Sequence, residues 1–180
     1  RHYGVRAEQI LVTRGSSEAI DVLIRGFCRA GEDRIVISPP TFGMYEAYAQ
    51  LQFAEIVRVP LLREDGYALD TAQLLAARDP AAKLLFICSP NNPTGNSFPL
   101  TQIEALARAW RETGVVVVDA AYAEFAEYDT TEDLLRNNPN VIVLRTLSKA
   151  MGLAGIRCGA MLGPPGAIQA LGCVLPPYTF

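Results

Sequence analysis

Five short segments of this chain carry groups that could bind a ligand or take part in catalysis. They are Gly15-Ser16-Ser17, Ser38-Pro39-Pro40-Thr41-Phe42, Ser89-Pro90-Asn91-Asn92-Pro93-Thr94-Gly95, Asp119-Ala120-Ala121-Tyr122 and Thr146-Leu147-Ser148-Lys149. A helix that begins near the first segment would offer free backbone N–H groups to a phosphate. The other segments supply an aromatic ring, an amide, a carboxylate near a phenol, and a lysine that follows two hydroxyl groups. In combination, these groups would suit an anionic aromatic aldehyde as a ligand.

Taken singly, each segment also has a structural explanation that needs no ligand. Gly-Ser-Ser before a helix commonly caps that helix, and Asn-Asn-Pro-Thr-Gly is typical of a turn. Asp119 could cap a helix or face solvent, and Lys149 could be an ordinary surface lysine. The placement of the segments in the expected fold therefore has to decide between the two interpretations.

Runs of branched aliphatic residues alternate along the chain with segments of helical spacing. Most of the runs are continuously apolar, as in strands that are covered on both faces. The expected strands are 10–13, 34–38, 55–59, 83–88, 115–119, 141–145 and 157–162. The expected helices are 16–29, 41–50, 70–77, 100–112 and 166–175. This alternation predicts an α/β fold, a three-layer αβα sandwich around a mainly parallel sheet of about seven strands.

Each of the five polar segments follows or ends one of the expected strands. Ligands of open parallel sheets bind outside the carboxyl ends of the strands. The five segments would therefore meet at one edge of the sheet, and this joint placement favours a functional site.

The composition argues against several other classes of protein. Half of the 180 residues are hydrophobic, and a formal net charge of -3 lacks the basic surplus of a nucleic-acid-binding surface. The four cysteines form no CxxC pair and the single histidine is His2, so we expect no metal site. No apolar run is long enough to span a membrane, and scattered free thiols suit a reducing compartment, which predicts a cytoplasmic protein without a membrane partner.

The same segments carry a family resemblance. The sequences Ser-Pro-Asn-Asn-Pro-Thr-Gly at 89–95, Asp-x-Ala-Tyr at 119–122 and Thr-Leu-Ser-Lys at 146–149, followed by Arg157, resemble the fold type I aminotransferases that use pyridoxal 5'-phosphate. The motifs occur in the order of that family, and the resemblance extends along the whole chain. Within the family, Pro-Pro-Thr-Phe-Gly-Met-Tyr at 39–45 and Arg-Thr-Leu-Ser-Lys at 145–149 most resemble the histidinol-phosphate aminotransferases.

The resemblance implies catalytic roles for Lys149, Asp119 and Tyr122. Lys149 would form a Schiff base with the cofactor and, once displaced by the substrate, act as the base that moves a proton. Asp119 would keep the pyridine nitrogen of the cofactor protonated. Tyr122 and Asn92 would hydrogen-bond the phenolic oxygen of the cofactor and favour its ionised form.

The resemblance also implies a site for the cofactor phosphate. Its ligands would be the backbone of Gly15-Ser16-Ser17, the hydroxyl groups of Thr146 and Ser148, and the guanidinium of Arg157. Arg157 begins the expected strand 157–162 and must nevertheless lie at the same sheet edge as the lysine. This strand is therefore expected to run antiparallel to its neighbours.

Two positions differ from the common family pattern. Phe42 would stack on one face of the cofactor ring where many relatives have tyrosine, and Ala121 would pack on the other face. Ala120 replaces a frequent glutamate and should point away from the cofactor, since successive residues of an extended segment face opposite sides. Tyr45 is expected to be a packing residue, although it could face the pocket or a partner subunit.

Some residues that bind the substrate and the cofactor in this family would lie outside this chain. Family members bind the substrate carboxylate with an arginine of a small C-terminal domain, and the partner subunit contributes an N-terminal tyrosine to the cofactor site. We therefore expect residues 1–180 to be the pyridoxal-phosphate-binding large domain, without the N-terminal arm and the small domain, of a protein that forms a homodimer.

The expected reaction of the full-length protein converts L-histidinol phosphate and 2-oxoglutarate to imidazole-acetol phosphate and L-glutamate. One alternative is another fold type I enzyme, an aromatic amino acid aminotransferase or a relative of threonine-phosphate decarboxylase. A second alternative is a non-catalytic effector domain of a transcriptional regulator that binds pyridoxal phosphate. The substrate-binding arginines would distinguish the enzymes, and the sequence before Arg1 would identify a regulator.

Overall fold

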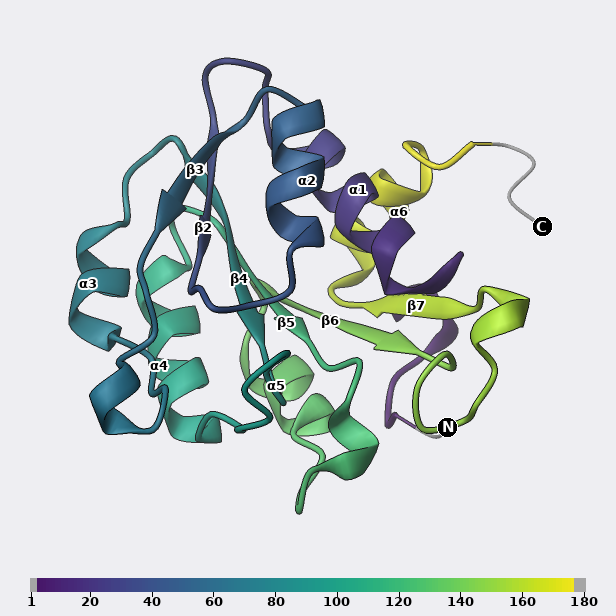
Figure 1. Ribbon diagram of the computed structural model, residues 1–180. Coiled ribbons are helices and arrows are strands. Elements are labelled where there is room, and N and C mark those ends of the chain that lie inside the picture. The colour runs from purple at the N-terminus through teal and green to yellow at the C-terminus, as the bar shows by residue number, and fades with distance from the viewer. Residues whose placement is uncertain (1–2, 177–180) are drawn as a thin grey trace.

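The computed structural model describes residues 3–176, which form one seven-stranded sheet between two layers of helices (Figure 1). The strand order is β1-β7-β6-β5-β4-β2-β3. The strands are β1 (Ile10–Thr13), β2 (Arg34–Ile37), β3 (Glu55–Arg58), β4 (Ala82–Cys88), β5 (Val115–Asp119), β6 (Val141–Thr146) and β7 (Gly159–Leu162). The α-helices are α1 (Gly15–Phe27), α2 (Met44–Leu51), α3 (Thr71–Ala76), α4 (Leu100–Trp110), α5 (Thr131–Asn137) and α6 (Pro165–Gly172). The predicted three-layer α/β fold is confirmed.

Strand β7 runs antiparallel to both of its neighbours, β1 and β6, while the other pairs are parallel. The predicted reversal of this strand is confirmed, but its predicted start at Arg157 is wrong. Arg157 ends the short 3-10 helix Ala154–Ile156 in a left-handed conformation, with φ 51°, and the strand begins at Gly159. Gly159 pairs with Thr13 on one side and Thr146 on the other, so this turn lies at the carboxyl ends of β1 and β6.

The helices divide between the two faces of the sheet. Helices α1, α2 and α6 cover one face, and α3, α4 and α5 cover the other (Figure 1). Strand β5 contributes to both cores, because Val116 and Val118 face the second layer and Val117 faces the first. This double coverage explains why the strands are continuously apolar instead of alternating.

Two local features differ from the sequence-based expectations. Helix α5 (Thr131–Asn137) was not expected, because Leu134 is the one apolar side chain that it buries and its sequence shows little periodicity. A capping role for Ser16 or Ser17 is wrong, because α1 already begins at Gly15 and both serines lie within its first turn.

The remaining sequence-based expectations concern absences. Within residues 3–176, no helix has the length and apolar character needed to cross a membrane. In the same range, no three His, Cys, Asp or Glu side chains are grouped so that they could hold a metal ion. His2 lies outside the described residues.

A buried arginine on β6 fixes the segment that follows β5. The Arg145 side chain is 2% exposed and donates to Glu124 at 2.7 Å, to Asp129 at 2.8 Å and to Thr131 at 3.0 Å. Its guanidinium also lies 4.8 Å from the centroid of the Tyr3 ring. These contacts tie the N-terminal segment and the residues before α5 to one strand of the sheet.

We predict that Arg145→Met destabilises the fold by about 3 kcal/mol, because it leaves the Glu124 and Asp129 carboxylates without their buried cation. We take the low end of the usual range because the Asp129 side chain is 40% exposed. Urea unfolding of the purified protein would measure the loss. The control is Arg136→Met, since Arg136 is 61% exposed and its ion pairs should contribute about 1 kcal/mol or less. Equal losses in the two variants would contradict the prediction.

Candidate functional site

Seven of the predicted site residues meet in a pocket at the carboxyl edge of the sheet. Asp119 ends β5, Cys88 ends β4, and Lys149 lies three residues beyond the end of β6. Helix α1 contributes Ser16 from its first turn. The pocket is lined by Ser16, Phe42, Cys88, Asn92, Asp119, Ala121, Tyr122 and Lys149. Seven of these eight residues belong to the site predicted from the sequence, and Cys88 is the addition.

The Asp119 carboxylate is the central acidic group of the pocket and is only 2% exposed. Its Oδ1 accepts a hydrogen bond from the Ala121 N–H at 3.2 Å, and its Oδ2 accepts one from the Tyr45 hydroxyl at 2.9 Å. Burial raises the pKa of Asp119, whereas the two hydrogen bonds and the nearby Lys149 charge lower it. The carboxyl group is therefore held by two donors in a site that otherwise disfavours its charge.

Lys149 and Tyr122 lie next to each other at the mouth of this pocket. The Lys149 Nζ is 5.2 Å from the centroid of the Tyr122 ring. Lys149 is exposed, and Tyr122 is half-buried. The amine can therefore reach a ligand in the pocket while the phenol lies beside it.

Phe42 and Ala121 supply apolar surfaces to the pocket. Ala121 is 6% exposed, and Phe42 is half-buried before the start of α2. The Phe42 ring meets the Tyr45 ring edge to face, with centroids 5.7 Å apart and an interplanar angle of 84°. An aromatic ligand would have an aromatic ring and a small side chain as neighbours.

A second set of polar groups gathers where α1, β6 and the turn before β7 meet. The Thr146 and Ser148 hydroxyl groups are 3.1 Å apart, and the Arg157 Nη1 lies 3.4 Å from the Ser148 Oγ. Gly15 has φ +74°, and a Cβ at this position would lie 2.8 Å from the Arg157 Nη2. The positive φ favours glycine here, and a side chain would have to displace the guanidinium. The guanidinium, two hydroxyl groups and a helix N-terminus together form a cationic site suited to a phosphate.

The loop between β4 and α4 is fixed by Asn91, which is 4% exposed. Its Nδ2 donates to the Pro40 carbonyl at 2.9 Å, and its Oδ1 accepts from the Thr41 hydroxyl at 3.1 Å. These bonds join the loop to the segment that carries Phe42. Asn92 is thereby placed at the pocket. Asn91 thus fixes the loop, whereas Asn92 lines the pocket.

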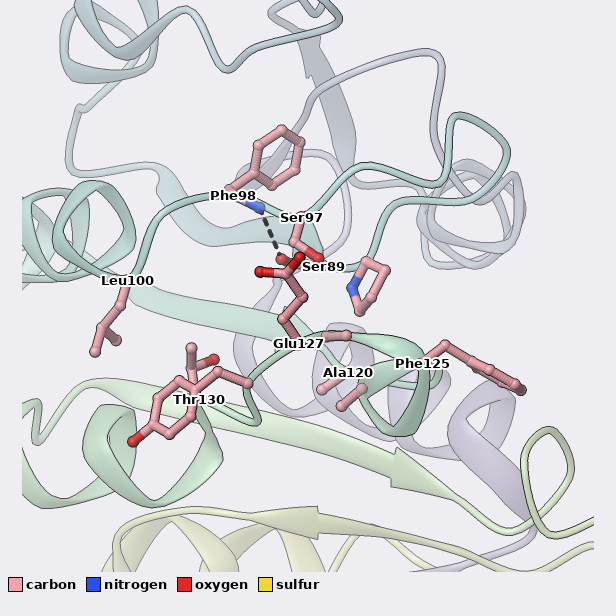
Figure 2. Close-up of a pocket in the computed structure, with 12 residues that line it drawn as sticks. Ser89, Ser97, Phe98, Leu100, Ala120, Phe125, Glu127 and Thr130 are labelled. Carbon is pink, nitrogen blue, oxygen red and sulfur yellow. Dashed lines mark hydrogen bonds between the residues drawn. The ribbon is translucent and has the colours of Figure 1, made fainter.

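Ala120 points away from this pocket, as the sequence predicts. It lines a second pocket on the other side of β5, together with Ser89, Phe98 and Glu127 (Figure 2). A hydrogen bond of 3.1 Å joins the Phe98 N–H to the Ser89 hydroxyl in this second pocket (Figure 2). The replacement of the frequent glutamate by alanine therefore changes the second pocket and leaves the first one intact.

Ser17 is the predicted site residue that the structure relates least closely to the rest. It is half-buried in the first turn of α1 and does not line the pocket. Conversely, the hydrogen bond from Tyr45 to Asp119 was not predicted from the sequence. Tyr45 lies three residues after Phe42, close to one helical turn, which is the one signal that could have indicated its position.

Comparison with known proteins agrees with this geometry. Residues 2–180 match the family described as aminotransferase class I and II. The chain belongs to this family. It is 46% identical over 178 residues to a histidinol-phosphate aminotransferase of Xanthomonas campestris pv. campestris, covering 98% of this chain and 49% of that protein. The chain thus spans about half the length of the curated relatives that it matches.

Two solved structures extend the comparison of family members. One, from Erwinia carotovora atroseptica and provisionally assigned as a histidinol-phosphate aminotransferase, has a TM-score of 0.87 and 31% identity, over 97% of this chain and 51% of its own. The other, a PLP-dependent aminotransferase from Streptococcus suis, has a TM-score of 0.84 and 27% identity, over 93% of this chain and 45% of its own. The sheet and its surrounding helices are thus common to family members of different origin.

We predict that Asp119→Asn makes the ligand-free protein more stable at neutral pH. Burial raises the pKa of Asp119 in the folded state, so the native carboxyl binds a proton more tightly than the unfolded one, whose pKa is about 3.9. The free energy of unfolding of the parent should therefore fall as the pH rises from about 4 through the raised pKa. Each tenfold increase in proton affinity corresponds to about 1.4 kcal/mol.

Thermal and urea unfolding between pH 4 and pH 8 would measure this difference between the parent and Asp119→Asn. Asp65→Asn, at an exposed position remote from the pocket lining, is the control. The prediction is wrong if the parent and Asp119→Asn lose stability in parallel over this pH range.

Proposed function

We propose that the protein containing this chain transfers the amino group of L-histidinol phosphate to 2-oxoglutarate, yielding imidazole-acetol phosphate and L-glutamate. The observation that carries the proposal is the meeting of a buried carboxylate, a lysine and a cationic phosphate-type site at one sheet edge. The choice of amino donor is supported by the 46% identity to a histidinol-phosphate aminotransferase. The alternatives with other donors share the same cofactor contacts, so substrate tests have to separate them.

The residues of the pocket fit pyridoxal 5'-phosphate as the cofactor. The space that a Cβ of Gly15 would fill lies against Arg157, beside the hydroxyl groups of Thr146 and Ser148, and this donor set complements a phosphate dianion. The buried carboxylate of Asp119 complements a protonated pyridine nitrogen. The structure from Streptococcus suis carries the name of a PLP-dependent enzyme.

When bound, this cofactor supplies an electron sink for the charge that develops at the substrate Cα. Asp119 would hold the proton at the ring nitrogen on which that sink depends. The Lys149 amine would hold the cofactor covalently and, once free, would act as the base that moves a proton at the substrate Cα. Tyr122 and Asn92 would hydrogen-bond the phenolic oxygen of the cofactor, and Phe42 and Ala121 would pack against its ring.

We further propose that residues 1–180 are the cofactor-binding large domain of a homodimeric cytoplasmic enzyme. The domain assignment is supported by the 49% share of the relative's length that the chain covers. The dimer follows from the family resemblance, in which the partner subunit completes the cofactor site. A reducing compartment is supported by the free thiols of Cys28, Cys88, Cys158 and Cys173.

We predict that Lys149→Ala abolishes covalent retention of pyridoxal 5'-phosphate. The parent should keep a visible absorbance band after free cofactor is removed by gel filtration, because the Lys149 amine would hold the cofactor covalently. Lys83→Ala, at a lysine on β4 outside the pocket lining, is the control and should retain the band. A band that survives Lys149→Ala unchanged would refute the assignment of the attachment site.

We predict that the full-length protein transaminates L-histidinol phosphate with 2-oxoglutarate at a higher kcat/KM than phenylalanine or tyrosine. Coupled detection of L-glutamate would measure the three donors side by side, with release of carbon dioxide from threonine phosphate as a fourth assay. Faster turnover of an aromatic amino acid or loss of carbon dioxide would favour the alternative enzymes. Cofactor binding without turnover of any donor would favour a non-catalytic effector domain.

A further inference from the structure

Tyr45 is a buried titratable residue to which neither the sequence motifs nor the proposed mechanism gives a task. It lies in the first turn of α2, its exposed fraction is 0%, and its hydroxyl donates to the Asp119 Oδ2 at 2.9 Å. The two residues are 74 positions apart in the sequence. Helix α2 thus supplies a hydrogen-bond donor to the central carboxylate of the pocket.

The ring of Tyr45 is held on two sides, and this fixes the direction of its hydroxyl. It stacks on Phe86 with centroids 4.7 Å apart and an interplanar angle of 17°, and it meets Phe42 at a centroid distance of 5.7 Å. A tyrosine has only two side-chain torsions that place the ring, so packing on this scale leaves the hydroxyl little freedom. The donor is therefore in place before any ligand binds.

Tyr122 lines the same pocket as Asp119. The titratable groups that interact electrostatically with Asp119 come from three elements. They are Tyr45 of α2, Cys88 at the end of β4 and Lys149 after β6. Burial raises the pKa of Cys88 to about 12, so its thiol stays neutral near pH 7. Burial and the Asp119 charge raise the pKa of Tyr45 well above its usual value, so its hydroxyl keeps its proton. Tyr45 is thus a permanent donor, and Lys149 is the one cation in this set.

We propose that Tyr45 is a positioning residue for the cofactor chemistry: its hydroxyl holds Asp119 ionised and fixed in direction, so that Asp119 can keep the ring nitrogen protonated. The Ala121 N–H, at 3.2 Å from Oδ1, is the second anchor of the same carboxylate. Without the Tyr45 donor, a carboxylate with so little exposure would bind a proton more tightly and compete with the ring nitrogen for it. The inference rests on the proposed cofactor site.

A purely structural role for Tyr45 predicts different behaviour. In that case the ring alone would matter, since it fills the space between Phe42 and Phe86. Tyr45→Phe keeps that ring and removes only the hydroxyl. It would then leave the ionisation of Asp119 and the properties of the bound cofactor unchanged.

The test compares the holoenzyme of the parent with Tyr45→Phe. A positive ring nitrogen lowers the pKa of the imine nitrogen that joins Lys149 to the cofactor, so weaker protonation of the ring should raise it. We expect the midpoint of the pH titration of the visible absorbance band to move to higher pH in Tyr45→Phe. We also expect kcat to fall about tenfold or more with little change in KM, because a hydrogen bond to a charged group is lost.

The matched control is Tyr128→Phe. Tyr128 is 62% exposed and its hydroxyl donates to Asp133, so this variant also removes a bond between a tyrosine and an aspartate, but outside the pocket. The unfolding of the ligand-free protein is measured as a second, independent readout. In the ligand-free protein, Asp119 lowers the free energy of unfolding over a pH range that ends at its folded-state pKa. The upper end of this range should move to higher pH in Tyr45→Phe and stay unchanged in Tyr128→Phe.

Replacement of Tyr45 by 3-fluorotyrosine provides a second test that preserves the packing. The fluorinated phenol is more acidic and a stronger donor, so the absorbance midpoint should move to lower pH, opposite to Tyr45→Phe. If Tyr45→Phe does not fold, the fluorinated protein decides alone. The inference is overturned if a folded Tyr45 variant has the same pH midpoint of the absorbance titration as the parent. Failure of the parent to retain pyridoxal 5'-phosphate would instead contradict the proposed function.

Discussion

The structure depends on placing one carboxylate, that of Asp119, at the end of a strand that is covered on both faces. Moving a carboxylate out of water is costly unless donors and an opposite charge replace the lost hydration. Here the Tyr45 hydroxyl and the Ala121 N–H bond to its two oxygens, and Lys149 provides the nearby positive charge. Burial still raises the pKa of Asp119, so these partners offset the cost only in part. A cationic ligand at the pocket would complete the compensation.

The reversed strand β7 provides the second half of the site. Gly159 lies between Thr13 and Thr146 in the sheet, and a Cβ there would come within 2.7 Å of the Gly15 backbone. Two glycines therefore let the start of α1 pack directly against the start of β7. The same reversal returns Arg157 to the carboxyl edge of the sheet, where a parallel strand would have carried it to the opposite edge. Strand direction and glycine placement together produce the cationic site.

The sequence predicted the elements and site groups that depend on local patterns. Continuous aliphatic runs located all seven strands, and the position of Arg157 correctly implied the direction of β7. Contacts between residues far apart in the sequence could not be predicted from local patterns. The bond from Tyr45 to Asp119 spans 74 residues. The spacing of Tyr45 from Phe42 indicates that Tyr45 could face the pocket, but it does not identify Asp119 as the partner. The left-handed conformation of Arg157 likewise depends on a turn that aliphatic periodicity cannot reveal.

The segment 119–124, at the end of β5, has contacts on both sides of the sheet. On the pocket side, Asp119 and Ala121 line the site, and the chain then continues through Tyr122 to Glu124. On the other side, Glu124 is bound at 2.7 Å by the buried Arg145 of β6. Strand β6 leads directly into the segment that carries Lys149. The same strand carries Arg145, which binds Glu124 two residues after Tyr122. The buried ion pair thus contributes to the site by fixing the position of Tyr122 relative to Lys149, which it does not touch.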